Sequence, residues 1–367
     1  MSSFAQALVH HPVLITPRDL RCMIGLVRDL HALSRRPDYQ ALVRENSPTI
    51  AGMDPGHDAV LMGYDFHLGP RGPRLIEVNT NAGGALLACL AQGSQGLTKR
   101  FGQQTLRSFC EEMRRQSKGE RLRPQRIAIV DEQPRAQFLY PEMQAYRDLF
   151  VDAGISAVII EPSELEEREE GLFHEGRAVD LIYNRHCDFY LESPAMAAIA
   201  RAYRRRRVCL TPNPFAYALL GDKRRMVLWS DAQVMGALHL PEKARERILE
   251  MVPVTRLLAD LGAEEAWRRR KELVFKPGTR FGSRGVYVGE RIARGRFESL
   301  PPSETLAQSL VPPSLTQVPG RERPLKTDLR LYAYRDQVHC VAARLYTGQV
   351  TNLQSEGSGF SPVRIAR

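Results

Sequence analysis

The sequence predicts a protein of mixed α/β and α+β class, with a small parallel sheet in its middle and antiparallel strands near its C-terminus. From Arg126 onward, short apolar runs alternate with amphipathic helical stretches, a pattern typical of parallel strands covered by helices. Leu331 to Tyr334 and Val338 to Arg344 are predicted to be consecutive strands. An earlier strand pair is expected between Leu61 and Asn79. We therefore expect three parts, covering residues 1–115, 125–215 and 216–367.

Composition and charge limit the classes of function. The chain has 367 residues, of which 43% are hydrophobic and 26% charged, as in an ordinary globular protein. No apolar run reaches the roughly 20 residues of a membrane span, and the N-terminus lacks the pattern of a signal peptide. The six cysteines show no metal-ligand spacing. These features favour a cytoplasmic protein with reduced thiols and no membrane partner.

The net charge of +10 favours acidic partners such as a nucleotide or a carboxylate substrate. The strongest basic run, Arg204 to Arg207, follows a predicted helix, where the helix dipole favours cations, so a solvated face explains it. Basic residues interleaved with aromatic ones are absent from the sequence, and we expect no nucleic-acid partner.

The first part combines helices, including Asp19 to Leu33, with the predicted hairpin. Because side chains alternate along a strand, Glu77 and Asn79 point to the same side, and Asp65 on the partner strand can face the same pocket. Two carboxylates and an amide oxygen suit Mg²⁺ that also contacts nucleotide phosphates. The alternative is an ordinary hairpin with one polar face.

The middle part should contain a parallel sheet whose ligands bind at the carboxyl ends of its strands. Its four predicted strands are Ile127 to Val130, Ile155 to Ile160, Val179 to Tyr183 and Val208 to Thr211. Arg185 follows the third strand directly and is a candidate clamp for a substrate carboxylate. Pairing with Asp188 or a nearby glutamate on the surface is an equal alternative.

The last part begins with helices and continues with a strand that ends at Lys276 and Pro277. A glycine-rich loop, Gly278 to Gly285, and a short return strand follow. Glycines let backbone N–H groups approach phosphate oxygens closely, and a lysine adds a point charge, although a tight structural turn explains the loop equally well.

The order of these features resembles that of the ATP-grasp family in a circularly permuted form. Family members carry, in order, a lysine before a helical segment, a strand-borne lysine with a glycine-rich loop, an adenine-contacting linker and a D-x-R strand. Arginine and asparagine on later strands and a metal hairpin complete the set. The matching positions here are Lys223, Lys276 with Gly282 to Gly285, Gln308 to Val311, Asp328 with Arg330, Arg344 and Asn352.

The metal hairpin stands near the N-terminus instead, and this is the permuted feature. Ile76 to Thr80 matches the "E-[IV]-N-T" strand of the eukaryotic-type glutathione synthetases, and the chain is also similar to glutathionylspermidine synthase-like carboxylate–amine ligases. The resemblance covers residues 56–360. Ser309 stands where many relatives have an acidic residue, and the early part is shorter than in the eukaryotic synthetases.

The resemblance implies an ATP-dependent carboxylate–amine ligase that works through an acyl phosphate, with ATP and Mg²⁺ as cofactors. Its substrates would be a small amino acid or a peptide, and its relatives are often homodimers, although the sequence marks no interface. A kinase on the same scaffold and a non-catalytic nucleotide-binding protein are the alternatives.

Roles follow residue by residue from the same resemblance. The metal ligands would be Asp65, Glu77 and Asn79. The nucleotide would be held by Lys223, Lys276, Gly282, Ser283, Arg284, Gly285, Gln308, Ser309, Val311 and Asn352. Arg330, Arg344 and Lys276 would be catalytic. The substrate would lie against Arg185, Asn81, Gly83 and Gly84.

Overall fold

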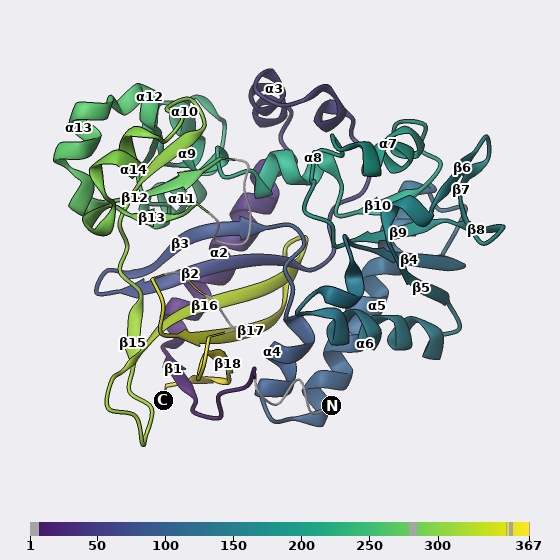
Figure 1. Ribbon diagram of the computed structural model, residues 1–367, viewed down its shortest axis with the longest axis horizontal. Coiled ribbons are helices and arrows are strands. Elements are labelled where there is room, and N and C mark those ends of the chain that lie inside the picture. Colours follow the sequence, from purple (N-terminus) through teal and green to yellow (C-terminus); the bar gives the residue numbers. More distant parts are fainter. Residues whose placement is uncertain (1–6, 279–284, 350, 352–354, 367) are drawn as a thin grey trace.

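A central antiparallel sheet joins the early hairpin to the C-terminal strands (Figure 1). The computed structural model describes residues 7–278, 285–349, 351 and 355–366. The strand order is β18 (Gly359–Ser361), β17 (Gln337–Tyr346), β16 (Leu325–Tyr334), β2 (Met62–Gly69) and β3 (Gly72–Asn79), and β15 (Ser314–Thr316) also pairs with β16. The pairing of β2 with β16 brings together residues more than 260 positions apart in the chain.

The two faces of the central sheet have different environments because strand side chains alternate. Leu329, Leu331 and Ala333 of β16 belong to a hydrophobic core that also contains the buried side of helix α2 (Pro17–Ser34). On the opposite face, Tyr332 packs in a second core with helix α4 (Ala85–Ala91). Nearer the start of β16, the same face carries polar side chains.

The predicted parallel sheet is present, in the order β10, β9, β4, β5. These strands are Cys209–Thr211, Leu181–Asn184, Arg126–Val130 and Ser156–Ile160. Ile127 and Ile129 pack in one core with helices α5 (Gln95–Gln116) and α6 (Tyr140–Asp152), whereas Ala128 and Val130 pack in the core that contains helix α7 (Ala197–Arg204). Helices therefore cover both faces.

A small antiparallel sheet follows β5, and the sequence did not predict it. Its strands are β6 (Glu166–Arg168), β7 (Gly171–His174) and β8 (Arg177–Val179). This segment is short and highly charged, so apolar alternation is weak. Val179 ends β8, and the third parallel strand therefore starts two residues later than predicted.

A further antiparallel sheet lies above the central one in Figure 1 and has its own core. Its order is β11 (Thr255–Leu257), β14 (Thr305–Ser309), β12 (Leu273–Pro277) and β13 (Tyr287–Val288). Helices α12 (Leu258–Leu261), α13 (Ala263–Arg268) and α14 (Arg294–Glu298) supply Leu258, Ala266 and Phe297 to this core. The lysine strand and the predicted adenine linker are thus neighbours.

The remaining elements connect these layers. They are helices α3 (Pro37–Glu45), α8 (Pro214–Ala216), α9 (Arg225–Ser230), α10 (Ala232–Ala237) and α11 (Glu242–Met251), and the parallel pair of β1 (Val13–Ile15) with β19 (Val363–Ile365). Within the described ranges, no helix has both the length and the apolar character to cross a membrane.

Candidate active site

One cavity of about 510 Å³ lies where the central sheet, the β11–β14 sheet and the loop before α6 meet. Most of the predicted site residues line it: Asp65, Glu77, Asn79, Asn81, Gly83, Gly84, Lys276, Gln308, Ser309, Val311, Arg330 and Arg344. These positions come from segments more than 200 residues apart, as the span between Asp65 and Arg330 illustrates. The fold therefore gathers them in one place.

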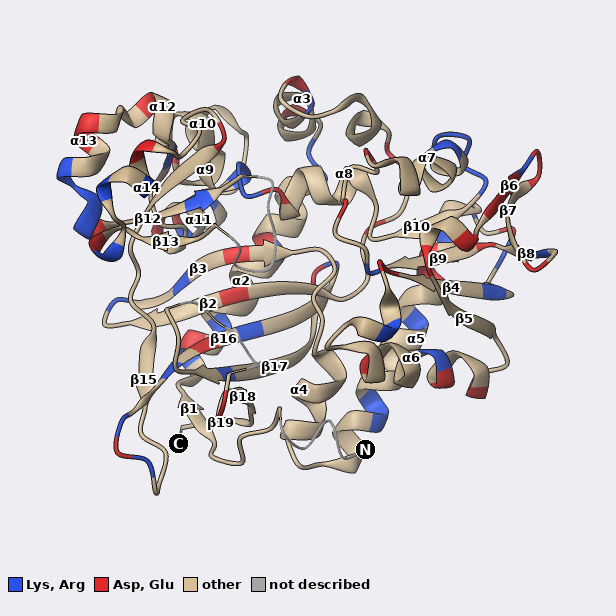
Figure 2. Cartoon of the chain, viewed as in Figure 1, with Lys and Arg blue, Asp and Glu red and all other residues tan. Residues whose placement is uncertain are grey.

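The strand register explains how the central sheet presents its polar side chains. Asp65 lies opposite Glu77 on one side and opposite Arg330 on the other, so three neighbouring strands contribute to one row. Acidic positions of β2 and β3 and basic positions of β16 accordingly lie side by side (Figure 2).

A β-bulge lies within this hairpin. Asp65 pairs with Glu77, but Phe66 pairs with Leu75, so Ile76 is an extra residue on β3. The bulge keeps Leu75 and Phe66 in the hydrophobic core and turns Ile76 toward the cavity. The carbonyl oxygen of Ile76 then accepts a hydrogen bond from Lys276 Nζ at 3.1 Å.

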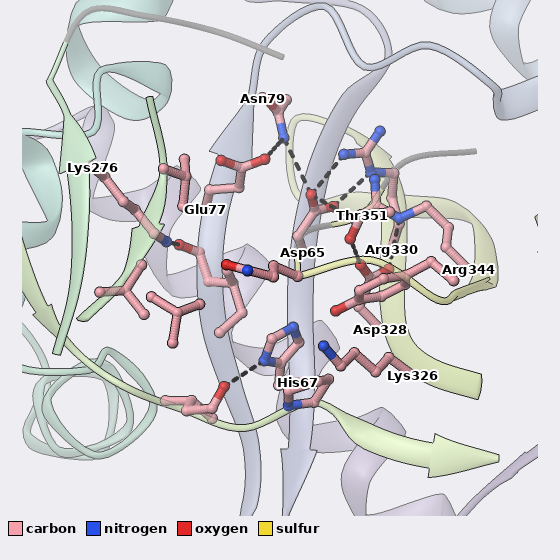
Figure 3. A pocket seen from close by; sticks show the side chains of 18 of the residues that line it. Asp65, His67, Glu77, Asn79, Lys276, Lys326, Asp328, Arg330, Arg344 and Thr351 are labelled. Atoms are coloured by element: carbon pink, nitrogen blue, oxygen red, sulfur yellow. Dashed lines mark hydrogen bonds and ion pairs between the residues drawn. The ribbon is translucent and has the colours of Figure 1, made fainter. Parts of the chain in front are cut away.

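Asp65 binds two arginines rather than facing the cavity with free oxygens (Figure 3). Arg330 donates from Nε to Oδ1 at 2.5 Å and from Nη2 to Oδ2 at 2.6 Å, and Arg344 donates from Nη2 to Oδ2 at 2.9 Å. Burial by itself raises the pKa of Asp65, but the two guanidinium groups outweigh it and hold the pKa well below its usual range. Direct coordination of a metal by Asp65 would require these arginines to move.

A second carboxylate completes the arginine cluster. Arg344 Nε donates to Asp328 Oδ1 at 2.6 Å, and the hydroxyl of Thr351 donates to Asp328 Oδ2. Asp65, Asp328, Arg330 and Arg344 are all at least nine-tenths buried. Two carboxylates and two guanidinium groups thus balance in charge. Asp65 orients Arg330, and Asp65 and Asp328 together orient Arg344.

Glu77 and Asn79 provide the oxygen ligands that remain for a metal. Asn79 donates from Nδ2 to Glu77 Oε1 at 3.2 Å and to Asp65 Oδ2 at 3.4 Å, which leaves its own Oδ1 for another partner. Among the described residues, no group of three or more His, Cys, Asp or Glu side chains could hold a metal ion. Mg²⁺ needs no such group, because it is commonly held by one or two carboxylates together with water and substrate phosphates. The donor set therefore fits Mg²⁺ bound together with a nucleotide.

Lys276 is buried, and its charge is supported from two directions. Its Nζ donates to Gln308 Oε1 at 2.7 Å as well as to Ile76. Burial lowers the pKa of Lys276 to about 8, with a further lowering by the charge of Lys223 and an opposing effect of Glu77. Lys223 therefore lies near Lys276, although it is not among the residues that line the cavity.

The predicted adenine linker is tied to its neighbours through its backbone. The N–H groups of Ser309 and Leu310 donate to the carbonyls of Val254 and Glu272, so these two donors are not available to a base. The Val311 carbonyl lies 2.7 Å from Nδ1 of His67, which must donate to it. Burial lowers the pKa of His67, consistent with a neutral ring in this role.

The predicted carboxylate clamp is bound to the backbone of another loop. Arg185 does not line the cavity, and its Nη1 donates to the carbonyl of Asn81 at 2.5 Å. The N–H groups of Gly84 and Leu86 donate to the buried carboxylate of Glu142 at 2.7 and 2.9 Å. The loop Asn81 to Gly84 is thus held by the protein's own charged groups, and the substrate contacts of Arg185, Asn81, Gly83 and Gly84 stay predictions.

Several predicted residues receive no placement at the cavity. Gly282, Ser283, Arg284 and Asn352 lie outside the described residues. Gly285 has a φ of +78°, which suits a glycine, but it is not among the lining residues. The structure therefore leaves the roles of these residues as predictions.

Sequence reasoning missed several lining residues: His67, Phe138, Leu139, Lys326, Tyr346 and Thr351. Lys326 was detectable in principle, because it precedes Asp328 and Arg330 at every second position of β16. Phe138 and Leu139 come from a loop with no local signal for a site.

Comparisons with known proteins give a fold and no family. No protein-family model matches the sequence, and no curated protein matches it. A glutathione synthetase-like effector from Globodera pallida, solved in apo form, superposes with a TM-score of 0.62 at 11% identity, over 98% of this chain and 90% of its own. The chain shares the fold of that protein. A protein proposed to be a γ-glutamylcysteine synthetase, from Methylobacillus flagellatus, gives a TM-score of 0.54 at 12% identity, over 95% of this chain and 88% of its own.

Proposed function

We propose that this protein is an ATP-dependent carboxylate–amine ligase with a circularly permuted ATP-grasp fold, acting on a small amino acid or a peptide through an acyl phosphate. One observation carries the proposal: a single cavity between two sheets brings Lys276, Arg330 and Arg344 together with Glu77 and Asn79. Joining a carboxylate to a phosphate requires two anions to meet, and such a cluster of cations with an oxygen ligand pair lowers that repulsion.

The nucleotide would lie between the central sheet and the β11–β14 sheet. Val274, Val288 and Leu310 line the cavity there and offer apolar contact to a base. Lys276 would contact the phosphates, with the Gln308 side chain holding its ammonium in place. Because Ser309 and Leu310 use their N–H groups internally, Val311 is the linker residue left to donate to adenine.

Glu77 and Asn79 would hold Mg²⁺, which would withdraw charge from the bound phosphates. Arg330 and Arg344 would stabilise charge on the transferring phosphoryl group and on the tetrahedral species formed when the amine attacks. Their fixed orientation on Asp65 and Asp328 means that little reorganisation is needed during the reaction. The protein contribution is therefore positioning and electrostatics, and no nucleophilic side chain is required.

The names of the two structural neighbours support this class of reaction. One is described as a glutathione synthetase-like effector and the other as a proposed γ-glutamylcysteine synthetase, and the two synthetases that these names refer to form an amide bond. A cytoplasmic location and a homodimer remain predictions from the sequence.

The test is release of ADP and phosphate from Mg-ATP over a panel of carboxylates and amines. Wild-type protein is compared with Glu77→Gln, and with Glu246→Gln as a matched control on the exposed surface of α11. We expect turnover that needs both an acid and an amine, is lost in Glu77→Gln and is kept in Glu246→Gln.

Two other outcomes identify the alternatives. ADP formation that needs an acceptor but no amine, and that yields a phosphorylated product without free phosphate, would indicate a kinase. A protein that neither binds nor hydrolyses ATP would contradict the assignment of the cavity as a nucleotide site.

A further inference from the structure

The end of the cavity away from the β11–β14 sheet has a different chemistry from its centre. Its lining consists of Asn81, Ala82, Gly83 and Gly84, with Phe138 and Leu139 from the loop before α6. None of these side chains is charged. The nearest charged groups are bound to the backbone of this loop. Arg185 Nη1 donates to the Asn81 carbonyl at 2.5 Å, Glu142 accepts from the Gly84 N–H at 2.7 Å, and Arg330 Nη1 lies 3.5 Å from the Gly83 carbonyl oxygen. This end of the cavity therefore adjoins the reaction centre but does not share its charges.

The backbone at this end has few free hydrogen-bonding groups. Ala82 donates its N–H to Leu61, Gly84 donates to Glu142, and the Gly83 carbonyl accepts from the hydroxyl of Tyr332 at 2.9 Å. The Asn81 side chain donates to the carbonyl of Arg185 at 3.3 Å. Arg185 and Glu142 do not line the cavity and are engaged with the loop backbone, so a charged group of a ligand would find no counter-charge among the side chains that line this end and would lose its hydration without compensation.

Phe138 and Leu139 supply an apolar wall. Phe138 is 45% exposed although it is a large apolar side chain, and it is one of the residues that line the cavity. Leu139 packs so closely on Gly83 that a Cβ at this position would overlap Leu139 Cδ1 and lie 2.7 Å from Arg185 Nη2. Leu139 is therefore fixed against the loop, and Phe138 beside it is the larger apolar side chain that a ligand can contact.

We infer that this end of the cavity binds an uncharged, apolar side chain of the amino acid or peptide substrate, and that Phe138 determines specificity for it. The inference rests on the proposed ligase function and makes it narrower. Polyamines and substrates with a second carboxylate are disfavoured at this end, because none of its six lining side chains is charged. Apolar surface on Phe138 would be covered when such a side chain binds.

The experiment compares wild-type protein with Phe138→Ala and Phe138→Asp in steady-state assays over apolar, acidic and cationic amino acids and amines. Leu122→Ala is the matched control, because Leu122 is 73% exposed and is not a lining residue. We expect Phe138→Ala to raise the KM of one reactant by about 10- to 100-fold, the range for a lost hydrophobic contact in a specificity pocket, with KM for ATP within about twofold. Phe138→Asp should shift preference toward cationic reactants. The reactant whose KM changes is the one that lies against Phe138.

A binding measurement separates failure of this inference from failure of the proposed function. Thermal denaturation is followed with a non-hydrolysable ATP analogue and the same panel of amino acids. Stabilisation by apolar amino acids that is lost in Phe138→Ala but kept in Leu122→Ala supports the subsite even if no turnover is found. Unchanged KM values and unchanged stabilisation in Phe138→Ala, or a wild-type preference for polyamines, would overturn it.

Discussion

Replacing Asp65 with asparagine is expected to disable Arg330 and Arg344 while leaving the Mg²⁺ requirement almost unchanged. The carboxylate accepts three hydrogen bonds from the two guanidinium groups. Asparagine keeps the shape of the side chain but has only one acceptor oxygen, and its amide nitrogen would face at least one guanidinium N–H. The variant therefore removes charge and acceptors without creating a cavity.

The magnitude follows from the lost contacts. Each charge-assisted hydrogen bond contributes about 1.5–3 kcal/mol, and removing one partner of a buried ion pair costs about 3–5 kcal/mol of the free energy of unfolding. Misplacing a group that stabilises transition-state charge costs about 10²–10³ in kcat. We expect Asp65→Asn to show both losses, with Asp336→Asn, an exposed change in the turn between β16 and β17, as the control.

Acid stability checks the same reasoning independently. The folded pKa of Asp65 is lowered, so the stabilisation by its ionised form is present above the ordinary carboxyl value of 3.8 and is lost as the pH falls below it. Asp65→Asn should therefore be less stable at neutral pH and lose less stability on acidification. The reasoning is refuted if high Mg²⁺ restores kcat in the variant, because Asp65 would then be a metal ligand.

Three further predictions concern the nucleotide side and the loop below it. Lys276 has a pKa of about 8 and must be protonated to bind phosphate, so kcat/KM for ATP should fall as the pH rises through about 8. In Lys276→Arg this fall in kcat/KM should occur at a higher pH. Gly83→Ala should lower activity strongly, because the added methyl group would displace Leu139. The control is Gly93→Ala, at an open position with a φ of +70°, which should reduce stability without changing KM. Equal KM values in the two variants would contradict the close packing of Leu139 on Gly83. Glu142→Gln should lower the free energy of unfolding by about 1–3 kcal/mol, because the N–H of Gly84 or of Leu86 would lose its acceptor. Denaturant titration measures this change, and an unchanged stability would mean that the loop is held in another way.

The sequence was informative where side-chain pattern and local geometry are linked. Alternation on β3 predicted that Glu77 and Asn79 point to the same side, and both line the cavity. Short apolar runs located all four parallel strands. These features depend on neighbours within a few residues, so pattern alone is sufficient.

The roles of Arg185 and Asp65 were not accessible in the same way. Arg185 binds the backbone of Asn81, 104 residues earlier, and Asp65 binds arginines more than 260 residues later. A charged residue in a sequence shows what it can pair with but not which partner the fold supplies. Arg185 and Asp65 were therefore predicted to contact ligands, and the structure shows them bound to the protein itself.

The β-bulge at Ile76 also affects how distant homologues must be aligned. In a related hairpin with regular pairing, no residue would stand between the positions of Leu75 and Glu77. Its side chains would still point alternately to the core and to the cavity. An ungapped alignment of the two would match core residues with cavity residues on one side of the bulge. Profiles that penalise a single-residue gap inside a strand will score this hairpin poorly, although its side chains occupy equivalent places in space.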